Sequence, residues 1–196
     1  MNRLLLLICL FLASLTCRPA EDPAWLDLLA DKGLSLWDVP EVNPWWQVQD
    51  GVLTGKSDPA KKGHTLWTKA SYQDVEVACE FRFEGDIDSG IFLRKPSLQV
   101  QIGTSRSLKR DMTASIYIPK KGYDGKAEGV DKLLKLGEWN QLKIRAQGET
   151  FTVWLNGQQV LEYTSSQFPG EAPVGLQIHP NVDMSVEFRN LKLRKL

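Results

Sequence analysis

Apolar and polar residues alternate along most of the chain downstream of residue 45. The clearest stretch is 75–83, where every second residue is apolar and most of the residues between are charged. A period of two residues is typical of a strand that buries one face. The same pattern predicts further strands at 46–49, 52–53, 90–94, 98–102, 115–118, 139–146, 151–155, 158–163, 174–178 and 185–193.

Turn signals separate these stretches at short intervals. Asp50-Gly51 and Asn156-Gly157 each join two alternating runs, and Asn-Gly is a strong signal for a two-residue hairpin. Apart from a short helix predicted at 24–29, no helical period interrupts the strands. The sequence therefore predicts an all-β fold, a two-sheet antiparallel sandwich. The stretch 104–135 is less regular and rich in Lys, Gly and Asp, which predicts either a functional rim or a mobile segment.

The N-terminal residues have the pattern of an export signal. Arg3 precedes an apolar run at 4–15 that is too short to span a bilayer. We expect a signal peptide within residues 1–20 and a single domain over 21–196, in a periplasmic or extracellular protein. An alternative is a lipoprotein signal that ends before Cys17, which would be the chain's one route to a membrane.

Charge and cysteine content exclude several classes of protein. Lys and Arg together number 24, as do Asp and Glu, and no long basic run occurs, so no nucleic-acid partner is expected. Cys79 is the one cysteine well inside the predicted domain, so an internal disulfide would require Cys17. Because Cys79 falls on the apolar side of its strand, we expect a buried thiol and no nucleophile.

Short motifs give the chain a resemblance to a known family. One is Ser-Gly-Ile-Phe-Leu-Arg at 89–94, and another is Gly-Leu-Gln-Ile-His at 175–179. Together they follow the order found in the 3-keto-disaccharide hydrolase domain family, which the chain resembles from about residue 26 onward. The motifs lie at 29–37, 46–54, 66–68, 80–82, 89–94, 137–140, 154–157, 174–179 and 187–191.

This resemblance implies a concanavalin-like jelly roll with a groove for a carbohydrate, and cleavage of the glycosidic bond in 3-keto-disaccharides or related glycosides. A ketone at C3 acidifies the proton at C2, so cleavage can proceed by elimination. That chemistry needs a base near C2 and an electrophile at the ketone oxygen, either a metal, a protonated side chain or a cation.

One position departs from the family pattern. Gln99 stands where the family carries an acid, and Gln101 shares its face of the predicted strand. An amide cannot act as a general base. The sequence therefore leaves two hypotheses open: a glycosidic-bond hydrolase or lyase, and a non-catalytic glycan-binding module on the same fold.

His179 and Glu80 are the candidate catalytic residues. The resemblance places a family histidine at His179, and a neutral imidazole suits proton abstraction or metal ligation; the alternative is a histidine on a loop at the rim. Glu80 and Arg82 share the polar face of one strand, either inside the groove or as an ion pair on a solvated face.

The remaining candidates would bind substrate. Arg94 could hold a hydroxyl or ketone oxygen with its guanidinium, or lie at the surface. Trp154 is predicted to face the groove, unlike the structural Trp37, Trp46 and Trp139, and His64 is predicted to lie solvated in a loop. The full set of predicted substrate-binding residues is Arg82, Arg94, Gln99, Gln101, Tyr117, Trp154 and Gln177. The sequence identifies no certain cofactor, and a divalent metal such as Ca²⁺ is conceivable. Asp86 and Asp88 could contribute ligands to it, although a polar turn is favoured there.

Overall fold

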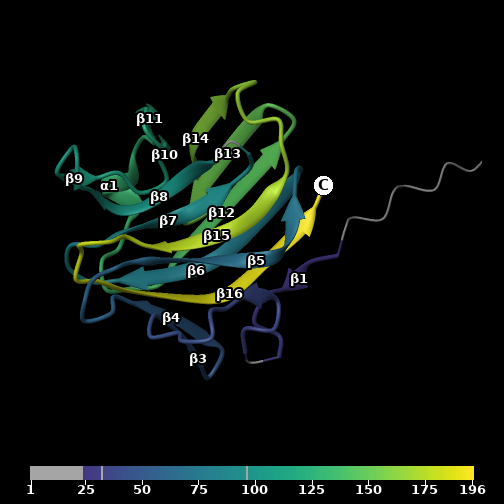
Figure 1. Ribbon diagram of the computed structural model, residues 1–196. Coiled ribbons are helices and arrows are strands. Elements are labelled where there is room, and N and C mark those ends of the chain that lie inside the picture. The colour runs from purple at the N-terminus through teal and green to yellow at the C-terminus, as the bar shows by residue number, and fades with distance from the viewer. Residues whose placement is uncertain (1–23, 32, 96) are drawn as a thin grey trace, which may run out of the picture.

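The computed structural model describes residues 24–31, 33–95 and 97–196. The predicted signal peptide and Cys17 lie outside these residues. Two antiparallel sheets of eight strands each pack face to face, which confirms the predicted all-β sandwich (Figure 1). Among the described residues, no helix has the length and apolar character needed to cross a membrane.

We call the two sheets sheet 1 and sheet 2. In spatial order, sheet 1 consists of β14 (Gln158–Thr164), β13 (Thr150–Leu155), β12 (Asn140–Gln147), β6 (Val75–Phe83), β16 (Ser185–Lys195), β4 (Val52–Lys56) and β3 (Trp46–Gln49), with β1 (Leu26–Asp27) paired to β16. Sheet 2 consists of β11 (Gly122–Gly125), β10 (Ile116–Ile118), β8 (Leu98–Ser105), β7 (Asp88–Leu93), β15 (Ala172–Ile178), β5 (His64–Tyr72) and β2 (Trp37–Asp38), with β9 (Arg110–Asp111) paired to β8.

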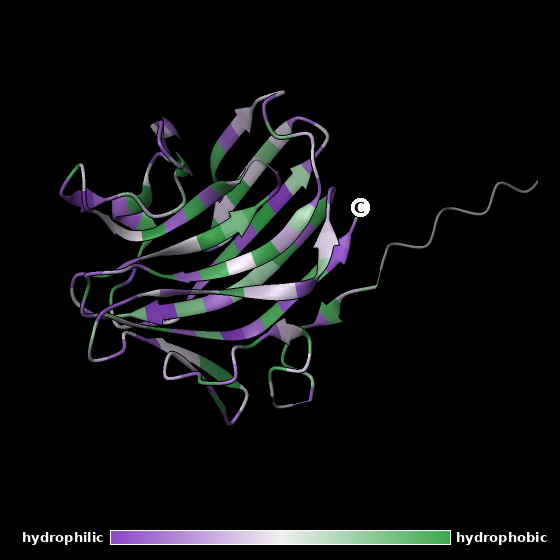
Figure 2. Ribbon diagram, viewed as in Figure 1, coloured by the Kyte–Doolittle hydropathy of each residue, from purple (hydrophilic) through white to green (hydrophobic). Residues whose placement is uncertain are grey.

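The core lies between the two sheets. Hydrophobic and hydrophilic residues alternate along the strands, as Figure 2 shows, and the hydrophobic ones meet in a single cluster. Large side chains such as Trp37, Trp46 and Phe81 are almost fully buried there, and each buried aromatic or aliphatic side chain stabilises the fold by about 1.5–3 kcal/mol. The predicted buried thiol is confirmed, because Cys79 is buried and its burial raises the pKa to about 12.

The Asn156-Gly157 hairpin is confirmed. Asn156 and Gly157 have φ values of 48° and 82°, the left-handed conformation that a two-residue turn between twisted strands requires. The turn joins β13 to β14. Asn156 also ties this end of sheet 1 together, since its Nδ2 donates to the carbonyl of Leu133 and to Asn140 Oδ1.

The helix predicted at 24–29 is wrong. Leu26 and Asp27 instead form β1, which pairs with Leu193 and Lys192 of β16. A helix of six residues is marginal in water unless packing stabilises it, and here the backbone gains a strand partner.

The prediction for His64 is also wrong, whereas the strand predicted at 115–118 is confirmed as β10. His64 is not solvated in a loop: it begins β5, stacks on Trp45 with ring centroids 4.6 Å apart, and accepts a hydrogen bond from Trp46 Nε1 at 3.1 Å. The irregular stretch 104–135 contains β9, β10, β11 and the short helix α1 (Val130–Leu133), which gather at one end of the sandwich beside β8 (Figure 1). The β10 and β11 strands extend sheet 2.

Candidate functional site

The outer face of sheet 2 carries a polar cleft of about 300 Å³. Strand pairing explains its composition, because residues opposite one another on neighbouring strands point to the same face. Gln99 lies opposite both Phe92 of β7 and Tyr117 of β10, and Gln101 lies opposite Gly90. We call this site the sheet 2 cleft; its lining is Asp88, Phe92, Gln99, Gln101, Ser105, Arg106, Ser107, Tyr117, Pro119, Tyr123, Gln177 and His179.

Five predicted site residues meet in this cleft. They are Gln99, Gln101, Tyr117, Gln177 and His179. They come from β8, β10 and β15 and from the residue that follows β15, so segments far apart in the sequence build one site.

Gln99 forms part of a fixed amide network. Its Nε2 donates to the carbonyl of Ser89 at 3.0 Å and to Gln177 Oε1 at 2.9 Å. The absence of a side chain at Gly90 makes this possible, because a Cβ there would lie 2.1 Å from Gln99 Nε2. The Gln177 side chain uses its oxygen in this contact, so its Nε2 group can donate to a ligand.

Asp88 places a buried carboxylate in the cleft beside the amide of Gln101. Its side chain is only 8% exposed, and Oδ1 accepts a hydrogen bond from Gln101 Nε2 at 2.9 Å. Oδ2 lies 3.5 Å from Arg106 Nε and 3.9 Å from His179 Nε2. The carboxylate therefore joins the amides, the guanidinium and the imidazole of the cleft.

His179 is held at the mouth of the cleft with its side chain 34% exposed. Its Nδ1 lies 2.6 Å from the carbonyl oxygen of Pro180. A carbonyl can only accept, so Nδ1 carries the hydrogen and the neutral ring has its lone pair on Nε2, the atom nearest Asp88. In this tautomer Nε2 can take a proton, and Asp88 would stabilise the imidazolium that results.

Two tyrosines form one wall. The rings of Tyr117 and Tyr123 lie 5.2 Å apart, centroid to centroid. Burial foremost, and then the negative charge of Asp88, raises the pKa of Tyr123 to about 12 despite a hydrogen bond with Ser105. The Tyr123 hydroxyl therefore stays protonated at neutral pH and can act as a donor.

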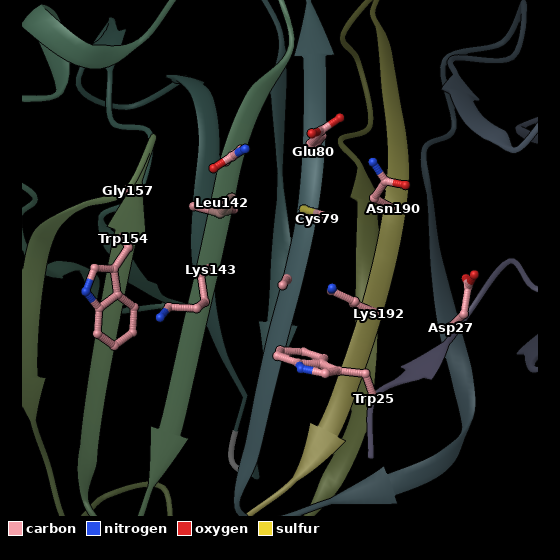
Figure 3. Close-up of a pocket in the computed structure, with 12 residues that line it drawn as sticks. Trp25, Asp27, Cys79, Glu80, Leu142, Lys143, Trp154, Gly157, Asn190 and Lys192 are labelled. Atoms are coloured by element: carbon pink, nitrogen blue, oxygen red, sulfur yellow. The ribbon is translucent and has the colours of Figure 1, made fainter. Parts of the chain in front are cut away.

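Glu80, Arg82 and Trp154 lie on the opposite side of the molecule. All three are on the outer face of sheet 1, where Glu80 and Trp154 border a separate hollow (Figure 3). Glu80 pairs with Arg189, and Arg82 Nε donates to Glu187 at 2.7 Å. The expectation that Glu80 and His179 serve one groove is therefore wrong, because the sandwich separates them.

Trp139 lies on the same outer face. It is half-buried, unlike Trp37 and Trp46, and the guanidinium groups of Arg82 and Arg189 cover its ring at 4.7 Å and 4.2 Å from the centroid. Its packing partners are thus the charged pairs of sheet 1 and not the core.

Arg94 is enclosed by the fold. Its side chain is 1% exposed, and its guanidinium donates to Asp74 Oδ1 and to the carbonyls of Phe168 and Gly148. The prediction that Arg94 contacts substrate does not fit this environment, because its Nη1 and Nη2 groups already bind protein acceptors. Its role is to join three loops.

Sequence reasoning missed Arg106 and Tyr123 and assigned Asp88 to a turn. Asp88 begins β7 and shares a face with Gly90 and Phe92. The alternation of the strand could therefore have placed Asp88 on the cleft face, had the strand been predicted to begin one residue before the family motif. Arg106 contacts both acids of this segment: its guanidinium donates two hydrogen bonds to Asp86, at 2.7 Å and 3.0 Å, and its Nε lies 3.5 Å from Asp88 Oδ2. Asp86 and Asp88 are thus both paired with a cation, and no group of three or more metal-ligating side chains occurs in the part of the chain described here.

Comparison with known proteins fits this architecture. The sequence pattern of the 3-keto-alpha-glucoside-1,2-lyase-like domain matches residues 24–194. The chain belongs to this family. The family is carbohydrate-related, as the resemblance in the sequence implied. None of the curated proteins compared with the chain matches it.

Solved structures share the fold at low sequence identity. A Parabacteroides distasonis protein proposed to be a glycosyl hydrolase is 24% identical, with a TM-score of 0.68 over 88% of this chain and 100% of its own. A Bacillus subtilis protein of unknown function with a galectin-like fold is 11% identical, with a TM-score of 0.61 over 77% and 86%. The carbohydrate-binding module CBM66 from B. subtilis is 16% identical, with a TM-score of 0.53 over 82% and 96%. These likenesses confirm the predicted jelly-roll fold, which hydrolases and binding modules share.

Proposed function

We propose that this protein is an exported enzyme that cleaves the glycosidic bond of 3-keto-disaccharides and related 3-keto-glycosides by elimination. Family membership supports the reaction class, and the observation that carries the proposal is the position of His179 Nε2, 3.9 Å from the Asp88 carboxylate inside a polar cleft. This pair supplies a base beside a fixed negative charge. Export rests on the sequence of the N-terminal residues.

In the proposed step, His179 Nε2 takes the proton from C2 of the 3-keto sugar. The electron pair of that C–H bond forms the C1–C2 double bond as the bond from C1 to the glycosidic oxygen breaks. The departing oxygen takes a proton, for which the Tyr123 hydroxyl is a protonated donor. Asp88 stabilises the imidazolium, and the products are an unsaturated 3-keto sugar and a free alcohol or sugar.

The amides of the cleft would recognise the ketone. Negative charge develops on the C3 oxygen as the C2 proton leaves, and hydrogen-bond donors fixed in advance stabilise such charge best. Gln177 Nε2 is such a donor, because Gln99 holds the other end of the same amide. Gln99 thus acts in positioning Gln177 and not as the base, which accounts for an amide at this position.

One observation favours a second function, a glycan-binding module. Both hydrogens of Gln99 Nε2 bind protein acceptors, and a fixed amide surface also suits recognition of sugar hydroxyls without cleavage. The two functions make different demands: cleavage needs the basic Nε2 of His179, and binding alone does not.

The test is incubation of the mature domain with 3-keto-trehalose, 3-keto-lactose and their unoxidised parents, with and without divalent metal, followed by chromatography of the products. Cleavage of the keto sugars alone, with an unsaturated product that absorbs in the ultraviolet, is the expected result. Binding of these sugars without cleavage under either condition would contradict the enzyme and favour the binding module.

A further inference from the structure

The outer face of sheet 1 has a hollow of about 610 Å³, larger than the sheet 2 cleft and on the other side of the sandwich. A volume of this size lies within the range of small-molecule sites, roughly 300–1,000 Å³. The proposed reaction does not use it. Its lining comes from β6, β12, β13 and β16 and from the N-terminal residues of the described chain.

Strand register explains how the hollow forms. Lys192 of β16, Ala78 of β6, Lys143 of β12 and Trp154 of β13 are successive partners in one row across four strands. Ala78 is the small residue in a face that otherwise carries long charged side chains. With strands about 4.8 Å apart, the row from Lys192 to Trp154 spans roughly 14 Å, which is enough for more than one sugar ring.

Ion pairs border the floor above and below Ala78. On the same strand, Glu80 pairs with Arg189 and Glu76 pairs with Arg194. These pairs hold their side chains over β6 and β16, so the space above Ala78 stays open between them. The floor of the hollow is therefore fixed by the strands of sheet 1, while Trp25 comes from the segment just before β1.

Two tryptophans stand on opposite sides of the floor (Figure 3). The Lys143 ammonium lies 4.0 Å from the centroid of the Trp154 ring, and the Lys192 ammonium lies 5.0 Å from that of Trp25. The Arg194 guanidinium also lies 4.9 Å from the Trp25 centroid. Both rings are half-buried, so part of each is accessible. Aromatic faces of this kind pack against the C–H faces of pyranose rings.

The charge of the hollow is positive. The charged side chains among the described lining residues are Asp27, Glu80, Lys143 and Lys192. Arg189 pairs with Glu80, which leaves the two lysines against Asp27 in this part of the chain. Within the described residues, Lys192 has no carboxylate within ion-pairing distance, and Lys143 has only Glu76 at 3.8 Å, which Arg194 already binds at 2.7 Å. A ligand that carried carboxylates could form ion pairs with the ammonium groups of both lysines.

We propose that this hollow is a second glycan-binding site, which takes an acidic oligosaccharide built from uronic acid residues. The tryptophans contact the ring faces and the lysines bind the carboxylates. The site would hold an acidic polysaccharide on the face away from the sheet 2 cleft, so binding and cleavage are separable.

The experiment is calorimetric titration with an oligogalacturonate, with its fully methyl-esterified form as a neutral probe of identical rings. We expect the acid form to bind in the micromolar to millimolar range, and more weakly as the salt concentration rises. The ester should bind at least about tenfold more weakly, because it loses the ion pairs with both lysines and the modest contributions of these pairs add up. Ala78→Leu fills the floor and should abolish binding. The double variant Lys143→Gln/Lys192→Gln should weaken binding roughly tenfold.

Two controls separate this site from the rest of the molecule. The double variant Lys69→Gln/Lys132→Gln removes two exposed lysines elsewhere and should bind as the parent does, as should His179→Asn, whatever its effect on cleavage. Circular dichroism of each variant checks folding. Four results would each overturn the proposal. They are equal binding of the acid and the ester, unchanged binding in Ala78→Leu and in Lys143→Gln/Lys192→Gln, binding of a poly-glutamate peptide as tight as that of the acid, and no heat of binding at a millimolar concentration of the acid.

Discussion

Replacing Gly90 with alanine tests how the sheet 2 cleft is built. A Cβ at this position would lie 2.1 Å from Gln99 Nε2 and 2.6 Å from the carbonyl oxygen of Val100. The Gln99 amide must then move, which breaks its hydrogen bonds to Ser89 and Gln177. Each such bond contributes about 0.5–1.5 kcal/mol, and overpacking against a backbone oxygen costs about 1–3 kcal/mol. We expect Gly90→Ala to lower the free energy of unfolding by about 2–6 kcal/mol, the sum of the two lost hydrogen bonds and the overpacking.

The assay is urea unfolding of the parent and of Gly90→Ala, with Gly33→Ala as the matched control. A Cβ at Gly33 meets nothing closer than 3.7 Å, so that variant should stay within about 1 kcal/mol of the parent. In Gly90→Ala/Gln99→Ala the clash with the Gln99 side chain is gone, while the contact with the Val100 carbonyl remains. A Gly90→Ala variant as stable as Gly33→Ala would refute the reasoning.

Three further predictions concern the scaffold. Arg94→Lys should lower the free energy of unfolding by about 2–4 kcal/mol in urea unfolding, because the ammonium cannot reach all three acceptors of this enclosed guanidinium; an unchanged midpoint would contradict this. Gly157→Ala should cost about 1–2 kcal/mol at its φ of 82°, measured in the same way, and no loss would argue against the left-handed turn. Burial lowers the pKa of His64. As the pH falls through about 6.5, the unfolded chain therefore takes up more protons than the folded one, and stability falls. Tm should drop more between pH 7 and pH 5 in the parent than in His64→Gln, and equal drops would contradict the assignment.

Local pattern was sufficient for most of the fold. The strand Val75–Phe83 was predicted with its exact bounds because burial on one face of a sheet imposes a strict alternation. The strand that begins at His64 was not recognised as one. Its first residue is polar, and its contact with Trp45 and Trp46 depends on residues far earlier in the chain.

The site was only partly predictable, for a related reason. Alternation placed Gln99 with Gln101, and Gln177 with His179, on the correct faces of their strands. It could not show that β6 and β15 belong to different sheets, so Glu80 was grouped with His179.

The partners of His179 depended on long-range structure. Asp88 reaches it through the pairing of β7 with β15, and the segment after β8 folds back to bring Arg106 and Tyr123 to the cleft. Contacts between segments so far apart in sequence leave no periodic signal.

The assignment of chemistry to the sheet 2 cleft rests on His179, and the initial rate of 3-keto-disaccharide cleavage decides it. We expect His179→Asn to lower kcat about a hundredfold to ten-thousandfold, the usual contribution of a general base, with Tm close to that of the parent. Glu80→Gln, on the outer face of sheet 1, should keep kcat within about threefold, since it removes only a partly exposed ion pair. A Glu80→Gln variant that is inactive but folded, beside a His179→Asn variant that still turns over, would contradict the proposed active site.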